Sequence, residues 1–274
     1  MLIPSASDRM FVKDFFSSRV FVVALCVLAT VDVGFILTHI GHKASVLSGA
    51  YHPLGHQRFN IESDRSYGEY FEYIKTAVCI VASFACFGIT KCSIYSVMSA
   101  AYVWLLLDNS IGLHEGLGRR VAPLLPGTGV LPFPGEALGE LAIFACFALA
   151  GLGLFAVSWR RSVGKHRAAG TVFVLLMAAL GVFAVGVDAL HVVSERFRQV
   201  VTDALGVVED GGELLVLSAH CAFMLSLWAK LHRANTAVLP AAPAEKRRPV
   251  RYGVTRPSVA ASPHRGPGGA TGGL

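Results

Sequence analysis

Long apolar stretches alternate with short polar connections along most of the chain. Six of these stretches approach the roughly 20 residues that an α-helix needs to cross a bilayer, at residues 19–40, 70–90, 93–113, 137–159, 168–193 and 207–231. The first stretch has no small-residue cleavage site, and its apolar core exceeds the ~7–15 residues of a signal peptide. The pattern therefore predicts an all-α polytopic membrane protein, a bundle of six transmembrane helices in which the first helix is retained.

The composition agrees with this class of protein. Of the 274 residues, 15% are charged and 54% are hydrophobic, whereas a soluble domain carries roughly 25% charged residues. The six cysteines all lie in or beside apolar stretches and include no CxxC pair. We therefore expect buried thiols rather than a disulfide framework or a thiolate metal site.

Basic residues indicate how the helices run. They precede the first stretch, stand between the second and third at Lys91, and recur at residues 159–167 and 228–233. Short cytoplasmic loops are enriched in Lys and Arg, so six crossings with both termini in the cytoplasm satisfy all four positions. We expect a multi-pass protein of the cell membrane, with the bacterial inner membrane as the favoured location. The Gly- and Pro-rich residues 116–136 are expected to form an irregular cap at the outer surface.

This topology divides the chain into three parts. Residues 1–18 form a cytoplasmic N-terminal segment, residues 19–233 the six-helix transmembrane domain, and residues 234–274 a cytoplasmic tail rich in basic residues, Pro and Gly. Such a tail cannot bury a core and is expected to be disordered. Beside a membrane, its charge favours anionic lipid as a contact, and no motif or aromatic pattern indicates a nucleic-acid partner.

Acidic and histidine residues gather in the half of each helix that this topology places outside. They are Asp32, His39, Glu69, Glu72, Asp108, His114, Glu115, Glu136, Glu140, Asp188, His191, Glu195, Glu209, Asp210, Glu213 and His220. Within a helix their spacings are mostly i, i+3, i+4 and i+7, which share one face. A polar stripe in lipid is expected to face the bundle interior.

Four acids in this set lie deep in the predicted helices: Asp32, Asp108, Asp188 and Glu213. Each costs about 2.5–3.5 kcal/mol at a helix centre when nothing compensates it. They have no obvious basic partner, since Lys75 alone lies in the outer half of a helix. Protons or a bound cation would neutralise them, and mixed carboxylate and imidazole ligands suit zinc, iron or manganese better than calcium or magnesium.

The pattern thus predicts an intramembrane metal site near the outer leaflet. The expected ligands are Asp108, Glu140, Asp188, His191 and Glu213, and the expected catalytic or proton-transfer groups are His114, Glu115 and His220. Di-metal four-helix bundles offer a partial parallel, since they combine carboxylates with acid-x-x-His pairs such as Asp188/His191. A metal-bound water would hydrolyse an amide or ester of a lipid or other amphiphile, and a di-iron centre would instead oxidise one.

Other interpretations stay open. Taken singly, acids at helix ends are ordinary interfacial residues, and His114, His191 or His220 is each typical of a hydrogen-bonded core histidine. The carboxylates would also suit a proton- or cation-coupled transporter, although their confinement to the outer half argues against a full path. A b-type haem held by His191 and His220 is a further alternative, as is a non-catalytic accessory protein.

The segments "LLLD…LHE", "GE…GE", "DALH" and "VEDGGELL" within residues 100–220 resemble uncharacterised bacterial multi-pass membrane proteins. Those proteins share a D-x(5)-HE helix end followed by acidic helix starts, and the resemblance implies no activity. In its chemistry the chain is also similar to alkaline ceramidases, membrane hydrolases with carboxylate and histidine zinc ligands. It lacks their HxxxH pair and their seventh helix, so no catalytic role is carried over.

Overall fold

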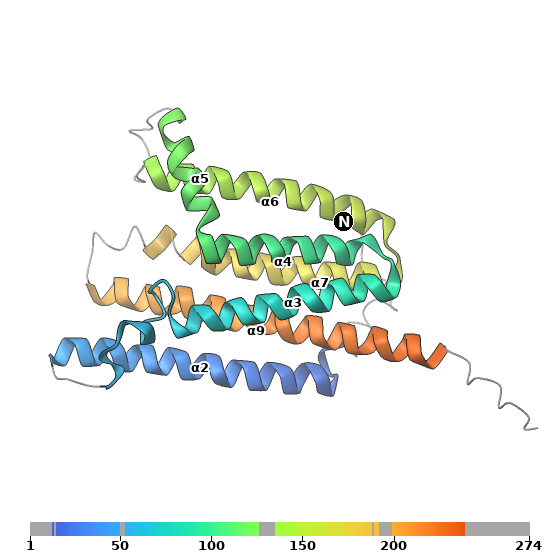
Figure 1. Cartoon of the computed structure of the whole chain (residues 1–274), viewed down its shortest axis with the longest axis horizontal. Coiled ribbons are helices and arrows are strands. Elements are labelled where there is room, and N and C mark those ends of the chain that lie inside the picture. The colour runs from blue at the N-terminus through green and yellow to red at the C-terminus, as the bar shows by residue number, and fades with distance from the viewer. Residues whose placement is uncertain are drawn as a thin grey trace, which may run out of the picture. The chain divides into compact units, whose positions relative to one another are not determined.

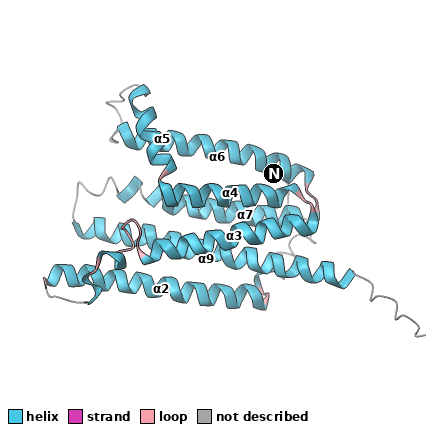
Figure 2. Cartoon of the chain, viewed as in Figure 1, coloured by secondary structure: helices cyan, strands magenta, loops and turns pink. Residues whose placement is uncertain are grey.

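The computed structural model describes residue 13 and residues 15–49, 53–125, 135–187, 189–191 and 199–238. These residues form helices joined by short loops and contain no strand (Figures 1 and 2). They belong to one compact unit. The predicted tail lies outside the described residues from residue 239 onward, whereas residues 234–238, also assigned to it, are helical.

The main helices follow the six predicted stretches. They are α2 (Arg19–Ser48), α3 (Tyr67–Thr90), α4 (Ser93–Ile111), α5 (Leu113–Val121), α6 (Gly135–Arg161), α7 (Gly164–Gly181) with the π-helical η4 (Val182–Val187), and α9 (Gln199–Val238). The short 3-10 turns are η1 (Pro53–Gly55), η2 (Gln57–Phe59) and η3 (Ala122–Leu124). Within the described ranges, five helices are long and apolar enough to cross a membrane, and α4 with α5 makes a sixth if this bent pair is one span. The all-α class with five or six membrane-length helices is therefore confirmed.

Helix α9 is the centre of the bundle. It packs against α2, α3 and α7 (Figure 1), and its residues Leu214, His220 and Phe223 are almost fully buried. Its 40 residues span about 60 Å at 1.5 Å per residue, roughly twice the hydrocarbon thickness of a bilayer. A bilayer crossing by α9 would therefore leave residues beyond the hydrocarbon at one or both ends of the helix.

The region expected to be an irregular cap is partly helical, which corrects that prediction for its first half. After α4, the chain turns by 74° at Gly112 and continues as α5 and η3, while residues 126–134 lie outside the described residues. Helix α5 packs against α6 through two glycines. A side chain on Gly118 would collide with the backbone of Glu140, and one on Gly139 with the Gly118 carbonyl.

The two ends of the bundle differ in charge. The α3–α4 turn at Lys91 and the α6–α7 turn beside Arg160 and Arg161 lie at one end. The loop of residues 53–66, the bend between α4 and α5 and the first turns of α9 lie at the other end (Figure 1). Most of the acidic residues are at this second end, which holds the candidate site.

Candidate functional site

A cavity of about 330 Å³ lies at the acidic end of the bundle. Its walls come from the loop before α3, the first turns of α3, the α4–α5 region and α9. Eight of the lining residues are acidic: Glu62, Asp64, Glu69, Glu72, Glu115, Glu209, Asp210 and Glu213. Among the described residues that line it, none is Lys, Arg or His. We call this space the acidic cavity.

Helix periodicity brings most of these carboxylates together. Glu209 and Glu213 are four residues apart on α9, and Glu69 and Glu72 are three apart on α3, so each pair shares a helix face. The Ser66 hydroxyl accepts a hydrogen bond from the Glu69 N–H and caps the start of α3. Because α3 packs against α9, the two acidic faces meet in one space.

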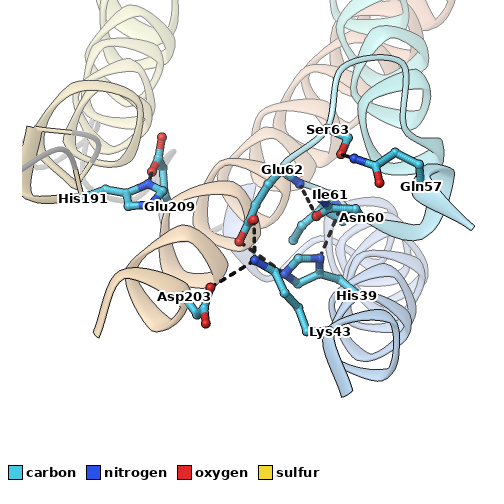
Figure 3. Close-up of polar contacts among 10 residues, drawn as sticks. All are labelled: His39, Lys43, Gln57, Asn60, Ile61, Glu62, Ser63, His191, Asp203 and Glu209. Carbon is cyan, nitrogen blue, oxygen red and sulfur yellow. Dashed lines mark hydrogen bonds and ion pairs between the residues drawn. The ribbon is translucent and has the colours of Figure 1, made fainter. Parts of the chain in front are cut away.

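A polar network fixes the loop that forms one wall (Figure 3). Lys43 Nζ lies 2.7 Å from Glu62 Oε2 and 3.2 Å from Asp203 Oδ1. The buried His39 presents Nε2 to Glu62 Oε1 at 3.5 Å, and its Nδ1 accepts the Ile61 N–H at 3.3 Å. The loop is thereby tied to α2 through His39 and Lys43, and Lys43 also connects it to α9.

Glu62 is the carboxylate in this wall whose charge is best defined. Partial burial raises its pKa, but hydrogen bonds and opposite charge from His39 and Lys43 outweigh burial and lower the pKa to about 2. Glu62 is therefore ionised at neutral pH and contributes a fixed negative charge to the acidic cavity.

A second pair joins His191, in residues 189–191, to Glu209 on α9. His191 Nδ1 lies 2.8 Å from Glu209 Oε2 (Figure 3). A Cβ on Gly206 would meet both the Glu62 carboxylate and the His191 ring. Gly206 therefore lets the loop and residues 189–191 approach the same turn of α9.

Asp108, a predicted ligand, lies at the α4–α5 bend and outside the cavity lining. Its Oδ1 accepts the His114 N–H at 2.8 Å, and its Oδ2 lies 2.9 Å from His114 Nδ1. The carboxylate thus clamps the first turn of α5 onto the end of α4. Glu140 lies across from this bend on α6, against Gly118.

His220 lies deeper in the bundle. It is 0% exposed, and its Nδ1 forms a 2.8 Å hydrogen bond with the Tyr102 hydroxyl.

The expectation that Asp32 lacks a basic partner is wrong, because Lys75 Nζ lies 2.9 Å from Asp32 Oδ1. Asp32 on α2 and Lys75 on α3 come into contact because both helices pack on α9. The linear sequence does not show this ion pair.

The predicted site residues therefore do not form one cluster. Glu115 and Glu213 line the acidic cavity, whereas His191 pairs with Glu209, and Asp188 lies outside the described residues. Among the described residues, no three His, Cys, Asp or Glu side chains are close enough to hold one metal ion. The metal-ligand assignment stays a prediction.

Six lining carboxylates were not among the predicted site residues: Glu62, Asp64, Glu69, Glu72, Glu209 and Asp210. The i, i+3 spacing of Glu69 and Glu72 could have predicted that these two side chains line the cavity together, since residues three or four apart share a helix face. Glu62 and Asp64 belong to a loop without periodicity, and only the folded contacts of that loop bring them to the cavity.

Together these features define a class: an all-helical protein with membrane-length helices and a carboxylate-lined cavity at one end of its bundle. The chain belongs to the family described as domain of unknown function (DUF8692), whose profile matches residues 66–227. The matched span runs from the start of α3 into α9 and excludes α2 and most of the loop before α3. No curated protein and no solved structure matches the chain.

Proposed function

We propose that this protein is a cation-binding membrane protein that takes up a hydrated divalent cation in the acidic cavity. The observation that carries the proposal is the gathering of eight carboxylates, with no basic side chain among the described lining residues, around about 330 Å³ of space. Like charges brought together in a partly buried site repel one another unless protons or cations neutralise them. A divalent cation neutralises two carboxylates at once.

The local partners leave much of this charge uncompensated. Lys43 pairs with Glu62, and His191 is a partner for Glu209. The Glu69 carboxylate accepts hydrogen bonds from two neutral donors, the Tyr73 hydroxyl and the Arg65 backbone N–H. For Asp64, Glu72, Glu115 and Asp210, no ion pair with Lys or Arg is found within the described part of the chain.

The chemistry of the lining favours a hard cation. Carboxylate oxygens suit Mg²⁺, Ca²⁺ or Mn²⁺, and Mg²⁺ in particular keeps several waters while one or two carboxylates hold it. The cavity has room for about ten waters at ~30 Å³ each. His114 and His220 bond residues outside the lining, and His191 bonds the lining residue Glu209 without itself being among the described lining residues. The cavity therefore suits a hard cation better than zinc or iron, which the sequence pattern also favours.

A second candidate function is metal-assisted hydrolysis of a lipid or other amphiphile. Glu115, one of the three predicted catalytic residues, lines the acidic cavity, where it would be a general base for water polarised by the cation. The haem alternative gains less support. Glu209, the partner of His191, is eleven residues from His220 on α9, about 16 Å along the helix axis.

We further propose that the acidic cavity opens on the outer side of a bacterial inner membrane, with both termini in the cytoplasm. The support is the opposite end of the bundle, which carries Lys91 in the α3–α4 turn, Arg160 and Arg161 at the end of α6, and Arg167 near the start of α7. Such residues mark cytoplasmic loops.

Manganese binding tests the proposal directly. The purified full chain in detergent is titrated with Mn²⁺, and free ion is measured by electron paramagnetic resonance. Glu213→Gln, which removes a lining charge, is expected to weaken Mn²⁺ binding at least fivefold. The control Glu136→Gln removes the same charge from an exposed residue of α6 and is expected to change the affinity less than twofold. Equal affinities for both variants, or no binding by the wild type, would contradict the proposal.

An experiment in liposomes distinguishes the two candidate functions. Reconstituted protein that only binds the cation is expected to leave the liposome lipids unchanged when Mn²⁺ is added. A hydrolase would instead release lipid products, detectable by mass spectrometry, in a Mn²⁺-dependent reaction that Glu115→Gln abolishes.

A further inference from the structure

Beneath the acidic cavity lies a fully buried ion pair that the cation site does not use. Lys75 and Asp32 are 1% and 0% exposed, and Lys75 Nζ lies 2.9 Å from Asp32 Oδ1. Lys75 follows the lining residue Glu72 by three residues on α3, and it donates a hydrogen bond to the carbonyl of the lining residue Leu214. The pair therefore stands about one helical turn deeper than the cavity wall.

The Lys75 ammonium occupies a shell of oxygen atoms drawn from two other helices. Nζ lies 2.9 Å from Asp32 Oδ1, 2.8 Å from the Leu214 carbonyl oxygen and 3.3 Å from Ser218 Oγ. Ser218 also donates to Asp32 Oδ2 at 2.5 Å, which holds the carboxylate in place. The Phe71 ring lies 4.8 Å from Nζ, a distance at which an aromatic face attracts a cation.

We propose that this oxygen shell is an inner site for a monovalent cation, occupied in the resting protein by the Lys75 ammonium as a tethered ion. An ammonium group is a compact, strongly hydrated point charge, so an alkali cation that loses its water in the same shell makes equivalent contacts. The shell is charged to receive one positive charge, because Asp32 supplies a single carboxylate and the other two ligands are neutral.

Replacement of the Lys75 ammonium by an alkali cation in this shell would change the contacts between helices. Lys75 on α3 holds Asp32 on α2 and Ser218 on α9 simultaneously, so it ties three helices together below the cavity. An entering cation would keep α2 and α9 joined through Asp32 and Ser218 and release α3. Entry through the acidic cavity rests on the proposed function, whereas the existence of the inner site does not.

Removing the tethered ion tests the inner site. Lys75→Gln leaves Asp32 and Ser218 in place and is expected to bind one Rb⁺ per chain that the wild type lacks, measured by equilibrium dialysis of the detergent-purified protein. Lys75→Arg keeps a tethered cation and is expected to gain none. The double variant Asp32→Asn/Lys75→Gln removes the carboxylate and is also expected to gain none.

Thermal unfolding supplies a second measurement, because a ligand that binds only the folded state stabilises it. Rb⁺ is expected to raise the melting temperature of Lys75→Gln above that of the same variant in a choline salt, and to leave the double variant unchanged. The inference is overturned if Lys75→Gln gains no Rb⁺, if the double variant gains it equally, or if Lys75→Gln stays unfolded in Rb⁺ while the double variant folds. Failure of the wild type to bind Mn²⁺ would reject the proposed function alone, since Rb⁺ binding by Lys75→Gln is measured without Mn²⁺.

Discussion

Asp108 and His114 hold the bend between α4 and α5 with two hydrogen bonds that the Asp108 carboxylate accepts. Asp108 Oδ1 accepts the His114 N–H at 2.8 Å, and Oδ2 lies 2.9 Å from His114 Nδ1. Gly112, between them, adopts the left-handed backbone conformation that permits the turn. Asp108, which the sequence pattern predicts to be a metal ligand, thus holds the α4–α5 bend in the folded protein.

Replacement of Asp108 is expected to loosen this bend. Asp108→Ala removes an acceptor for an N–H in the first turn of a helix, a change that costs about 0.5–2 kcal/mol at such positions. Asp108→Asn keeps one acceptor oxygen and is expected to cost less. Melting temperatures in detergent measure both effects, with Ser110→Ala as the control, since Ser110 is exposed and its side chain bonds only the Leu107 carbonyl. Equal melting temperatures for Asp108→Ala and the control would show that the clamp contributes nothing.

The sequence was sufficient for the helices and insufficient for the pairing of their side chains. Hydrophobic stretches of membrane length dictate helices because no other backbone arrangement satisfies its hydrogen bonds in lipid except a closed barrel. The rotation of each helix and its neighbours depend on packing details such as the contact between α5 and α6 at Gly118 and Gly139. This is why helix periodicity predicts that Glu209 and Glu213 share one face, whereas it gives no sign of the Asp32–Lys75 ion pair.

The glycine contact between α5 and α6 yields a stability prediction. Gly118→Ala would place a Cβ within 2.7 Å of the Glu140 backbone, so the two helices must move apart, and a lower melting temperature is expected. The matched control is Gly116→Ala in the same helix, where nothing lies within 4 Å of the added Cβ. Because alanine is the better helix former by about 0.5–1 kcal/mol, this control is expected to be neutral or stabilising. A similar loss of stability in both variants would count against backbone packing at Gly118.

The network around Glu62 predicts a dependence of stability on pH. The folded pKa of about 2 lies below the ordinary value of 4.5, so the ionised carboxylate favours the folded state. Its contribution is complete above about pH 4.5 and is lost as the pH falls toward 2. The difference in melting temperature between the wild type and Glu62→Gln is therefore expected to shrink over this acidic range.

Asp64→Asn provides the comparison at neutral pH, because it removes a charge from the same loop at an exposed residue for which the described structure gives no ion pair. Its effect on the melting temperature is expected to be smaller than that of Glu62→Gln. A wild-type advantage over Glu62→Gln that stays constant from pH 7 to pH 3 would refute the assignment of the ionised carboxylate to the folded state.

Two tyrosine–histidine hydrogen bonds, each 2.8 Å long, differ in the burial of the histidine. Removal of the tyrosine hydroxyl is therefore expected to lower the stability of the fold by different amounts. Tyr102 bonds His220 in the core, whereas Tyr95 bonds His166, which is only partly buried. Tyr102→Phe strands a fully buried imidazole and is expected to cost about 1–3 kcal/mol, while Tyr95→Phe lets water replace the lost hydroxyl. Unfolding in detergent is expected to show the larger decrease for Tyr102→Phe, with Mn²⁺ affinity unchanged because His220 lies outside the cavity lining. An equal decrease for the two variants would mean that burial of the histidine does not set the cost, and weakened Mn²⁺ binding in Tyr102→Phe would connect His220 to the cation site.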